Sequence, residues 1–231
     1  MDAYLQASDV IDWQSPAVST LAMQLASTQS VTTKKSAGWP EGRDVAIART
    51  CFEWVRDRIR HSYDYQLNPV TCRASEVLQH KTGYCYAKSH LLGALLRANG
   101  IPAGFCYQRL SVNETGAPYC LHGLNAVYLA DFGWYRIDAR GNKPGIDAQF
   151  TPPQEQLAFS IRLPGEAHFE AILSEPLPAV VQALQTYQTW DEVLANLPDC
   201  SPEIATTPEV SPSEASAGLS LEADDWPLRD L

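Results

Sequence analysis

The chain has 231 residues, of which 45% are hydrophobic and 19% charged, and its formal net charge is −10. This length can bury one good core, whereas the acidic balance argues against nucleic-acid binding, which needs a clustered basic surface. No apolar stretch approaches the roughly 18 residues of a spanning helix, and the N-terminus lacks the features of a signal peptide. The sequence therefore predicts a soluble, cytoplasmic protein with no nucleic-acid or membrane partner.

Capping residues and apolar spacing predict the elements of the first part of the chain. Ser15-Pro16 is typical of a helix start, and the Gly- and Pro-containing stretch 27–42 is predicted to be a loop. A strong helix begins at Arg43 and is expected to end near His61, because apolar residues recur at three- and four-residue steps. The stretch 63–70 is expected to be extended or irregular.

A second strong helix follows Gly83 and is predicted to be the buried centre of the domain. Its apolar stripe covers much of the helix circumference and consists of Tyr84, Ala87, Leu91, Leu92, Leu95, Leu96 and Ala98. Asn99-Gly100 is a typical C-cap, and Pro102 prevents the helix from continuing. Cys85 lies in the first turn of this helix.

The segment from 103 to about 140 is predicted to form β-structure. Its strands cover 105–112, 121–129 and 134–137, and hairpin pairing is the simplest connection between them. Two short helices are predicted further along, at 178–187 and 190–197. Thr189 and Glu192 fit a capping box at the start of the second of these helices.

One α+β domain is expected over residues 1–200, with its core at 45–140 and helical additions at both ends. Composition changes after Cys200, where Pro, Ser, Ala, Thr and Glu dominate. Residues 201–231 carry seven acidic side chains against one basic side chain. Such a segment cannot bury enough apolar surface to fold alone, so an acidic, disordered tail is predicted.

Of the six cysteines, only Cys85 is in a position that favours chemistry. None forms a C-x-x-C pair, so reduced and buried thiols are expected for most of them. A thiol is a useful nucleophile only as thiolate, and a helix N-terminus favours that negative charge. Cys51 and Cys106 are predicted to lie inside a helix and a strand, where this advantage is absent. Cys85 is therefore the candidate nucleophile, and its backbone N–H could also donate to an oxyanion.

His122 and Asp138 are the candidate partners of this nucleophile. His122 opens one predicted strand and Asp138 closes the next. With a three-residue loop at 130–132, Leu124 opposes Asp138, and His122 lies one diagonal step away on the same face. A two-residue loop would place the two side chains on opposite faces. The hypothesis is that Asp138 orients the imidazole of His122, which deprotonates Cys85.

Three landmarks resemble the core of the transglutaminase-like superfamily. Gly83-Tyr84-Cys85 opens a helix that ends in the segment 95–103 (LLRANGIPA), Leu121-His122-Gly123 begins a strand, and Asp138 ends the next. The landmarks occur in the order typical of that family, and the resemblance covers about residues 45–140.

The resemblance implies a papain-like arrangement, in which a central cysteine-bearing helix packs on an antiparallel β-sheet that carries the histidine and the aspartate. It also implies a cysteine-dependent acyl transfer from a peptide or protein amide through a thioester. The sequence departs from many relatives in two places that flank the active-site cleft. Gly123-Leu124-Asn125 stands where a small residue and tryptophan are usual, and 139–143 lacks the common proline. Substrate preference is therefore not carried over.

Several alternatives stay open at this point. Hydrolysis by a peptidase or amidase is favoured because water needs no acceptor site, but an amine acceptor would make the protein a transglutaminase-type transferase. The fold could also serve as a non-catalytic interaction module. A zinc site would use Cys85, Cys106, Cys120 and His122, but short paired ligand motifs are absent, so neither a metal nor another cofactor is expected.

Two further residues near the predicted nucleophile have roles that the sequence leaves open. Gln79 is a weak candidate for a second oxyanion donor, with a solvated helix end as the more ordinary interpretation. Lys88, one turn after Cys85, could stabilise the thiolate, with a solvated lysine as the favoured interpretation. The sequence gives no indication of the oligomeric state.

Overall fold

The structure is a computed structural model that describes residues 1–28, 35–36, 39–40 and 42–201. The predicted acidic tail lies outside these residues, apart from Ser201. The helices are η1 (a 3₁₀-helix, Asp2–Leu5), α1 (Pro16–Ser27), α2 (Arg43–Arg58), α3 (Ser62–Tyr65), α4 (Ala74–His80), α5 (Cys85–Ala98), α6 (Pro178–Thr186) and α7 (Trp190–Ala195).

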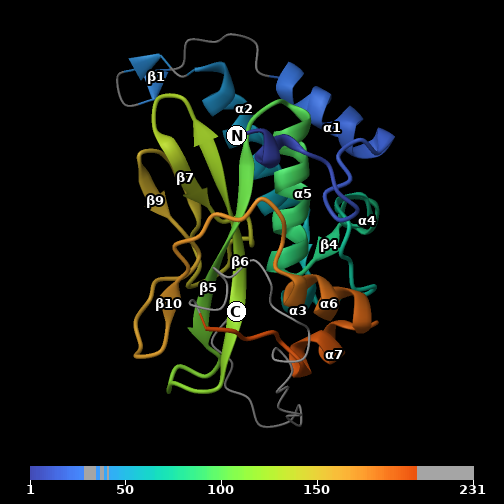
Figure 1. The fold of residues 1–231 in the computed structure, drawn as a ribbon, viewed down its shortest axis with the longest axis vertical. Helices are drawn as coiled ribbons and strands as arrows, with labels where there is room; N and C mark the ends of the chain where they lie inside the picture. The colour runs from blue at the N-terminus through green and yellow to red at the C-terminus, as the bar shows by residue number, and fades with distance from the viewer. Residues whose placement is uncertain (29–34, 37–38, 41, 202–231) are drawn as a thin grey trace.

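A four-stranded antiparallel sheet in the order β10-β5-β6-β7 lies beside the helices (Figure 1). Its strands are β5 (Ala103–Ser111), β6 (Tyr119–Leu129), β7 (Gly133–Ile137) and β10 (Ala167–His168). Three two-stranded pairings complete the β-structure: β1 (Lys35–Ser36) with β2 (Trp39–Pro40), β3 (Arg60–His61) with β4 (Thr82–Gly83), and β8 (Gln149–Thr151) with β9 (Gln154–Gln156).

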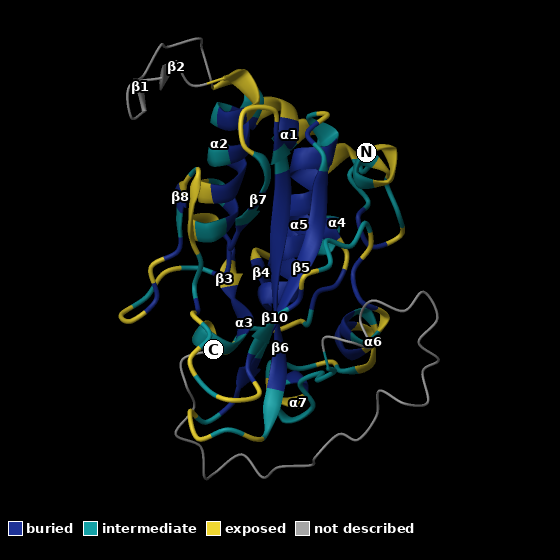
Figure 2. Ribbon diagram, turned by 60° about the vertical axis from the view of Figure 1, so that its left-hand side comes forward, coloured by how far each residue is buried: buried dark blue, intermediate teal, exposed yellow. Residues whose placement is uncertain are grey.

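The helix α5 is the buried centre of the molecule, as its wide apolar stripe predicts. Every residue of α5 except Ala98 is buried, and Figure 2 shows the helix in dark blue beside the sheet. The Asn125 amide of β6 donates to the carbonyl of Ser89 at 3.0 Å. A methyl group at Gly93 would approach the Phe105 ring to 3.0 Å, so the helix and β5 are in close contact.

Helices α1, α2 and α4 pack against α5 (Figure 1), and α2 also contacts β6 and β8. The α+β fold class, with a central cysteine-bearing helix on an antiparallel sheet, is thereby confirmed. The predicted capping box of Thr189 and Glu192 at the start of α7 is also present.

Two stretches that were predicted to be irregular contain short regular elements. The stretch 27–42 holds the paired strands β1 and β2, and α3 forms one helical turn within 62–65. Gln66 ends α3 in the left-handed conformation, with φ at 50°. The strand β3 pairs in parallel with β4, which is distant in sequence. Pairings of two residues leave no periodic pattern that a single sequence could reveal.

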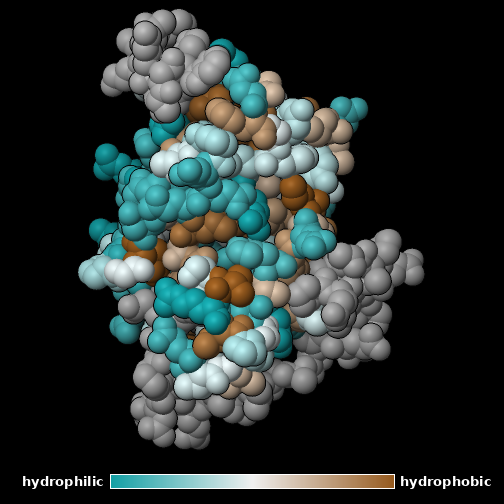
Figure 3. All heavy atoms as spheres, turned by 90° about the vertical axis from the view of Figure 1, so that its left-hand side faces the viewer, coloured by the Kyte–Doolittle hydropathy of each residue, from teal (hydrophilic) through white to brown (hydrophobic). Residues whose placement is uncertain are grey.

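The surface in Figure 3 is mainly hydrophilic, with apolar side chains in small, separate groups. Large hydrophobic side chains that are exposed among the described residues are Met1, Met23, Tyr65 and Phe132. None of the described helices is long and apolar enough to cross a membrane. All six cysteines are free thiols, as expected.

Candidate active site

Cys85 is the first residue of α5. The chain enters this helix from β4, where Gly83 pairs with His61 of β3. A methyl group at Gly83 would come within 3.0 Å of the Ala87 side chain, so this close approach of the chain requires glycine. The positive end of the helix dipole favours a negative charge on the Cys85 sulfur.

The hairpin of β6 and β7 brings His122 and Asp138 together. Leu129 pairs with Gly133, which confirms the register predicted for a three-residue loop. The Nε2 atom of His122 lies 2.8 Å from Oδ2 of Asp138, and both side chains are buried. The two residues therefore share one face of the hairpin.

Neighbouring main-chain groups fix the carboxylate of Asp138. The N–H of Ala158 donates to Oδ2 at 3.0 Å, and the N–H of Arg140 donates to Oδ1 at 3.1 Å. The ring of Phe159 packs edge-on against the ring of His122, with 4.9 Å between their centroids. Both members of the pair are thus held in a single orientation.

Charge within the site changes the pKa of both partners. Burial alone would lower the pKa of His122, but the charges of Asp138 and Cys85 and hydrogen bonds to both raise it to about 10. Burial alone would raise the pKa of Asp138, but the imidazolium of His122 and the main-chain hydrogen bonds lower it. An ionised carboxylate facing an imidazolium is consistent with both directions.

The thiol of Cys85 completes the line of contacts. Its side chain and the His122 ring line the same pocket, and the Cys85 side chain is among the groups that raise the pKa of His122. Because Nε2 faces Asp138, Nδ1 is the nitrogen left for the sulfur. The N–H of Gly123 in β6 also points to Sγ, at 3.5 Å. The three predicted residues Cys85, His122 and Asp138 are therefore adjacent in the order thiol, imidazole and carboxylate.

His61 belongs to this site, although the sequence indicated only a helix end there. Its Nε2 atom accepts a hydrogen bond from the Cys85 backbone N–H at 3.2 Å. That N–H was expected to be available to an oxyanion, but in this structure the imidazole of His61 occupies it. The ring also packs edge-on against Tyr84. Only the parallel pairing of β3 with β4 brings His61 here, and no sequence signal predicts that pairing.

The surroundings of His61 keep its ring neutral. Burial lowers the pKa of His61 well below its ordinary value, and the nearby cations Arg140, Lys88, His122 and Lys143 lower it further. Nε2 accepts a hydrogen bond from the backbone N–H of Cys85, so the ring proton of His61 lies on Nδ1. Nδ1 is 3.8 Å from Oδ2 of Asp64. No hydrogen-bond partner for Nδ1 exists among the described residues.

Asp64 of α3 ties the loop after Asp138 to the His61 side of the site. The guanidinium of Arg140 donates to both carboxylate oxygens of Asp64, at 2.7 and 2.9 Å, and Lys143 adds a contact at 2.7 Å. The same guanidinium lies over the ring of Phe159. This buried arginine therefore connects Asp64 with the ring that packs on His122.

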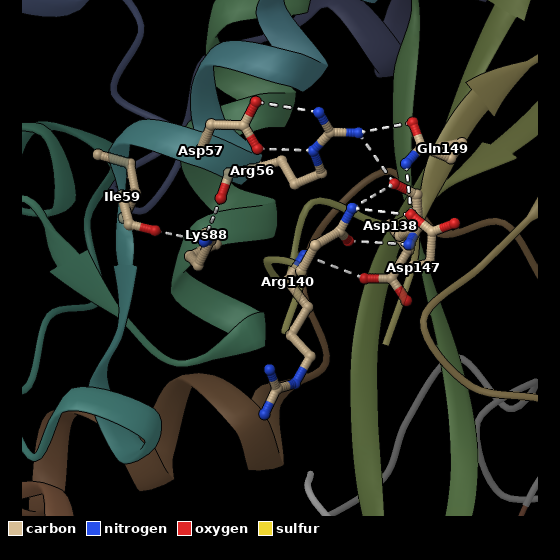
Figure 4. Close-up of polar contacts among 10 residues, drawn as sticks. Arg56, Asp57, Ile59, Lys88, Asp138, Arg140, Asp147 and Gln149 are labelled. Atoms are coloured by element: carbon tan, nitrogen blue, oxygen red, sulfur yellow. Dashed lines mark hydrogen bonds and ion pairs between the residues drawn. The ribbon is translucent and has the colours of Figure 1, made fainter. Parts of the chain in front are cut away.

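Lys88 is buried, so its interpretation as a solvated lysine is wrong. Its Nζ donates to the carbonyls of Arg56 and Ile59 at the end of α2 (Figure 4). Burial and then the charge of Arg140 lower the pKa of Lys88 to about 7, against the opposing attraction of nearby acids, Asp64 first. The sequence could not show this because the receiving carbonyls come from another helix.

A small apolar pocket opens beside Cys85. Its walls are His61, Tyr63, Tyr84, Cys85, Tyr86, Cys120, Leu121, His122, Leu194 and Leu197. Gln79, the weak candidate for a second oxyanion donor, is exposed on α4 and is not part of these walls. The contribution of α7 and the residue range after it was not predicted.

The residues of the rival zinc site are not gathered around one point. Cys106 packs with Leu124 and Ala126 in a separate apolar cluster, whereas the neighbouring Asn125 faces α5. Among the described residues, no group of three or more His, Cys, Asp or Glu side chains is arranged to hold a metal ion.

A family model described as the transglutaminase-like superfamily matches residues 31–139. No curated protein matches the chain.

Three similar solved structures have TM-scores of 0.40. A candidate cysteine protease from Cytophaga hutchinsonii is 18% identical, over 61% of this chain and 42% of that chain. The periplasmic domain of TgpA from Pseudomonas aeruginosa is 18% identical, over 59% of this chain and 45% of that one. Red sea bream transglutaminase is 16% identical, over 56% of this chain and 27% of that one. The chain thus spans less than half the length of each of these proteins.

Proposed function

We propose that this chain, whose residues 31–139 match the family model of the transglutaminase-like superfamily, is a cysteine-dependent acyl-transfer enzyme that hydrolyses a peptide or isopeptide amide. Cys85 is the nucleophile, His122 the acid and base, and Asp138 the residue that orients His122. The observation that carries the proposal is the line of contacts in which Cys85 and His122 share one pocket wall and His122 lies 2.8 Å from Asp138.

The proposed reaction has two stages. The Cys85 thiolate attacks the amide carbonyl carbon, the C–N bond breaks, and His122 passes its proton to the leaving amine. This leaves a thioester on Cys85. Water then attacks the thioester carbonyl while His122 accepts a proton from the water. Cleavage of the C–S bond releases a carboxylic acid and restores the thiolate.

The raised pKa of His122 supports the first stage. A pKa of about 10 keeps the imidazole protonated at neutral pH, so its proton is available to the leaving amine. The imidazolium also stabilises the neighbouring thiolate. The helix N-terminus acts in the same direction.

The experiment uses p-nitrophenyl acetate, a small activated ester that needs no specific peptide-binding site. The expected result is a burst of one p-nitrophenolate per enzyme and an acetyl group on Cys85, located by peptide mass spectrometry. The variants Cys85→Ser and His122→Ala should lose the burst. Cys106→Ala and His168→Ala are the matched controls and should retain it, because Cys106 packs in a separate apolar cluster and His168 lies in β10.

Adding a primary amine such as glycinamide distinguishes hydrolysis from transfer. Acetate as the product at every amine concentration supports hydrolysis. Release of N-acetylglycinamide, formed by transfer of the acetyl group from Cys85 to the amine, would favour the transglutaminase-type alternative. Absence of any acetyl group on Cys85 would contradict the enzyme proposal and favour a non-catalytic interaction module. The proposal further includes a peptide or protein amide as substrate and a cytoplasmic location.

A further inference from the structure

The last described part of the chain passes over the pocket of Cys85. Residues 190–200, here called the strap, comprise α7 and the extended segment that follows it. Leu194 and Leu197 of the strap form part of the same pocket wall as Cys85 and His122. Cys85 is only 7% exposed as a result of this packing and that of its other neighbours.

The strap binds the edge of β6 through its main chain. The N–H of Leu121 donates to the carbonyl of Pro198 at 2.8 Å. β7 pairs with β6 from Asn125 onward, leaving this end of the strand uncovered by β7. The N–H of Gly123, two residues along the same edge, points to Sγ of Cys85. The Pro198 carbonyl therefore lies about 7 Å along the strand from the group that faces the nucleophile.

An ion pair anchors the end of the strap. The carboxylate of Asp199 accepts two hydrogen bonds from Arg109 of β5, at 2.7 and 2.6 Å. The guanidinium of Arg109 also lies over the ring of Tyr119, 4.0 Å from its centroid. This bidentate geometry recognises a carboxylate at a fixed distance from the nucleophile.

The other end of the strap is fixed to the body of the protein. Val193 is fully buried, and the hydroxyl of Tyr84, the neighbour of Cys85, donates to the carbonyl of Trp190. The N–H of Trp190 donates to the Asn68 side chain at 2.8 Å. These contacts hold residues 190–193, which precede the part of the strap that lines the pocket.

The pocket that remains beside Cys85 has a volume of about 30 Å³. The side chains of Leu194 and Leu197 form part of the wall of this small pocket. The strap is the part of the wall that has the chemistry of a peptide: a main-chain carbonyl on the β6 edge, a leucine in the pocket and a carboxylate on Arg109.

We propose that residues 194–199 occupy the acyl-donor site, and that the acyl donor is an extended peptide which displaces them. A carbonyl of the peptide would accept a hydrogen bond from the N–H of Leu121. An apolar side chain of the peptide would lie between Tyr63 and Tyr84. The peptide would present a carboxylate to Arg109 two residues after that apolar side chain. This inference rests on the proposed function, since it assigns the substrate class to the same site.

The test compares the labelling of Cys85 by a small reagent, iodoacetamide, and a bulky one, fluorescein maleimide. Asp199→Asn removes the charge that holds the strap on Arg109 and should accelerate labelling by the bulky reagent about threefold to fivefold, with little change for iodoacetamide. Glu155→Gln is the matched control, because Glu155 forms a similar bidentate pair with Arg136 outside the strap. A second variant, Leu197→Ala, should accelerate bulky labelling as well.

The peptide acetyl-LANLPD-amide, which copies residues 194–199, should slow the labelling of Cys85 in Asp199→Asn. The same peptide with Asn in place of Asp should be a weaker competitor. Equal rates of bulky labelling in the original protein, Asp199→Asn and Leu197→Ala would overturn the strap. If Cys85 reacts no faster than Cys200 with iodoacetamide in any variant, the proposed function fails instead, so the two failures are distinguishable.

Discussion

The Nε2 atom of His122 and Oδ2 of Asp138 lie 2.8 Å apart across the β6–β7 hairpin, in a buried site. The carboxylate accepts two main-chain N–H groups in addition to this contact. It therefore remains ionised, and its charge favours the protonated ring of His122. The state of the Cys85 thiol depends in turn on that ring.

Replacing Asp138 with Asn should remove this charge while preserving the shape of the side chain. We expect the pKa of His122 to fall and the alkylation of Cys85 at neutral pH to slow, because the imidazolium beside the thiol is lost. The rate of acyl transfer should fall by about 10- to 100-fold. The pH dependence of iodoacetamide labelling at Cys85 measures the first effect, and the acetylation rate with p-nitrophenyl acetate measures the second.

Asp147→Asn is the control for this prediction, because the side chain of Asp147 accepts hydrogen bonds from Asn142, Gln149 and Gln156, which lie outside the line of contacts. An Asp138→Asn profile that superimposes on that of the original protein would mean that Asp138 does not act on His122.

A methyl group at Gly123 should disrupt the contact between β6 and the start of α5. It would lie 2.8 Å from Cδ1 and 3.3 Å from Cα of Tyr86, and the helix backbone cannot move away without carrying Cys85 with it. Gly123→Ala should therefore cost about 1–3 kcal/mol of unfolding free energy and lower the acetylation rate.

Chemical denaturation and the p-nitrophenyl acetate burst measure these two effects. Gly42→Ala is the matched control, since a methyl group there would lie 3.7 Å from the Asp131 side chain, its nearest contact among the described residues. Full stability and full burst in Gly123→Ala would show that the packing of Tyr86 on β6 does not position the nucleophile.

Two buried groups should give the stability of the protein opposing pH dependences. The pKa of His122 is raised from 6.5 to about 10, so its contribution to stability is full below pH 6.5 and is lost as the pH rises through 10. The pKa of Lys88 is lowered from 10.5 to about 7, so the unfolded chain binds more protons and stability rises with pH across that window.

Lys88→Met should leave only the falling contribution of His122. The unfolding free energy of this variant should decrease between about pH 7 and 8.5, below the range in which cysteines of the unfolded chain ionise, whereas that of the original protein should change little over the same range. Urea denaturation at a series of pH values measures the slope. Lys143→Met serves as the control, and equal slopes for Lys88→Met and the original protein would contradict the account.

Arg140→Met should destabilise the region around Asp64. The guanidinium is fully buried and donates to both oxygens of that carboxylate. Without it, Asp64 retains only Lys143 of the two cations, and the loss should approach about 3 kcal/mol of unfolding free energy. Arg136→Met, which breaks a partly exposed pair with Glu155, should cost about 1 kcal/mol or less. Equal losses in the two variants would contradict the importance assigned to burial.

Much of the fold could be predicted because its main signals are local. The apolar stripe of α5 and the capping residues of α7 are read within one element. The contact between His122 and Asp138 is distant in sequence, but a three-residue hairpin loop determines it through the strand register. The number of residues in the loop is therefore enough to predict that the two side chains share one face.

The parts that were missed depend on contacts between elements with no periodic signal. His61 reaches Cys85 only through the parallel pairing of β3 with β4. Lys88 can be buried because carbonyls at the end of α2 accept hydrogen bonds from its ammonium group. Leu197 reaches the pocket from far along the chain. Pairings of two residues and acceptors from another helix cannot be read from the residues themselves.

Iodoacetamide labelling of every cysteine, followed by peptide mass spectrometry, tests most directly whether Cys85 is an activated nucleophile. Burial raises the pKa of Cys51, Cys72 and Cys106 to about 12 and that of Cys200 to about 11, so these thiols should react slowly at pH 7. The account predicts that Cys85 reacts at least about tenfold faster than each of them, and that His122→Ala removes this advantage while His168→Ala does not. Slow labelling of Cys85, at the rate of Cys200 and unaffected by His122→Ala, would contradict it.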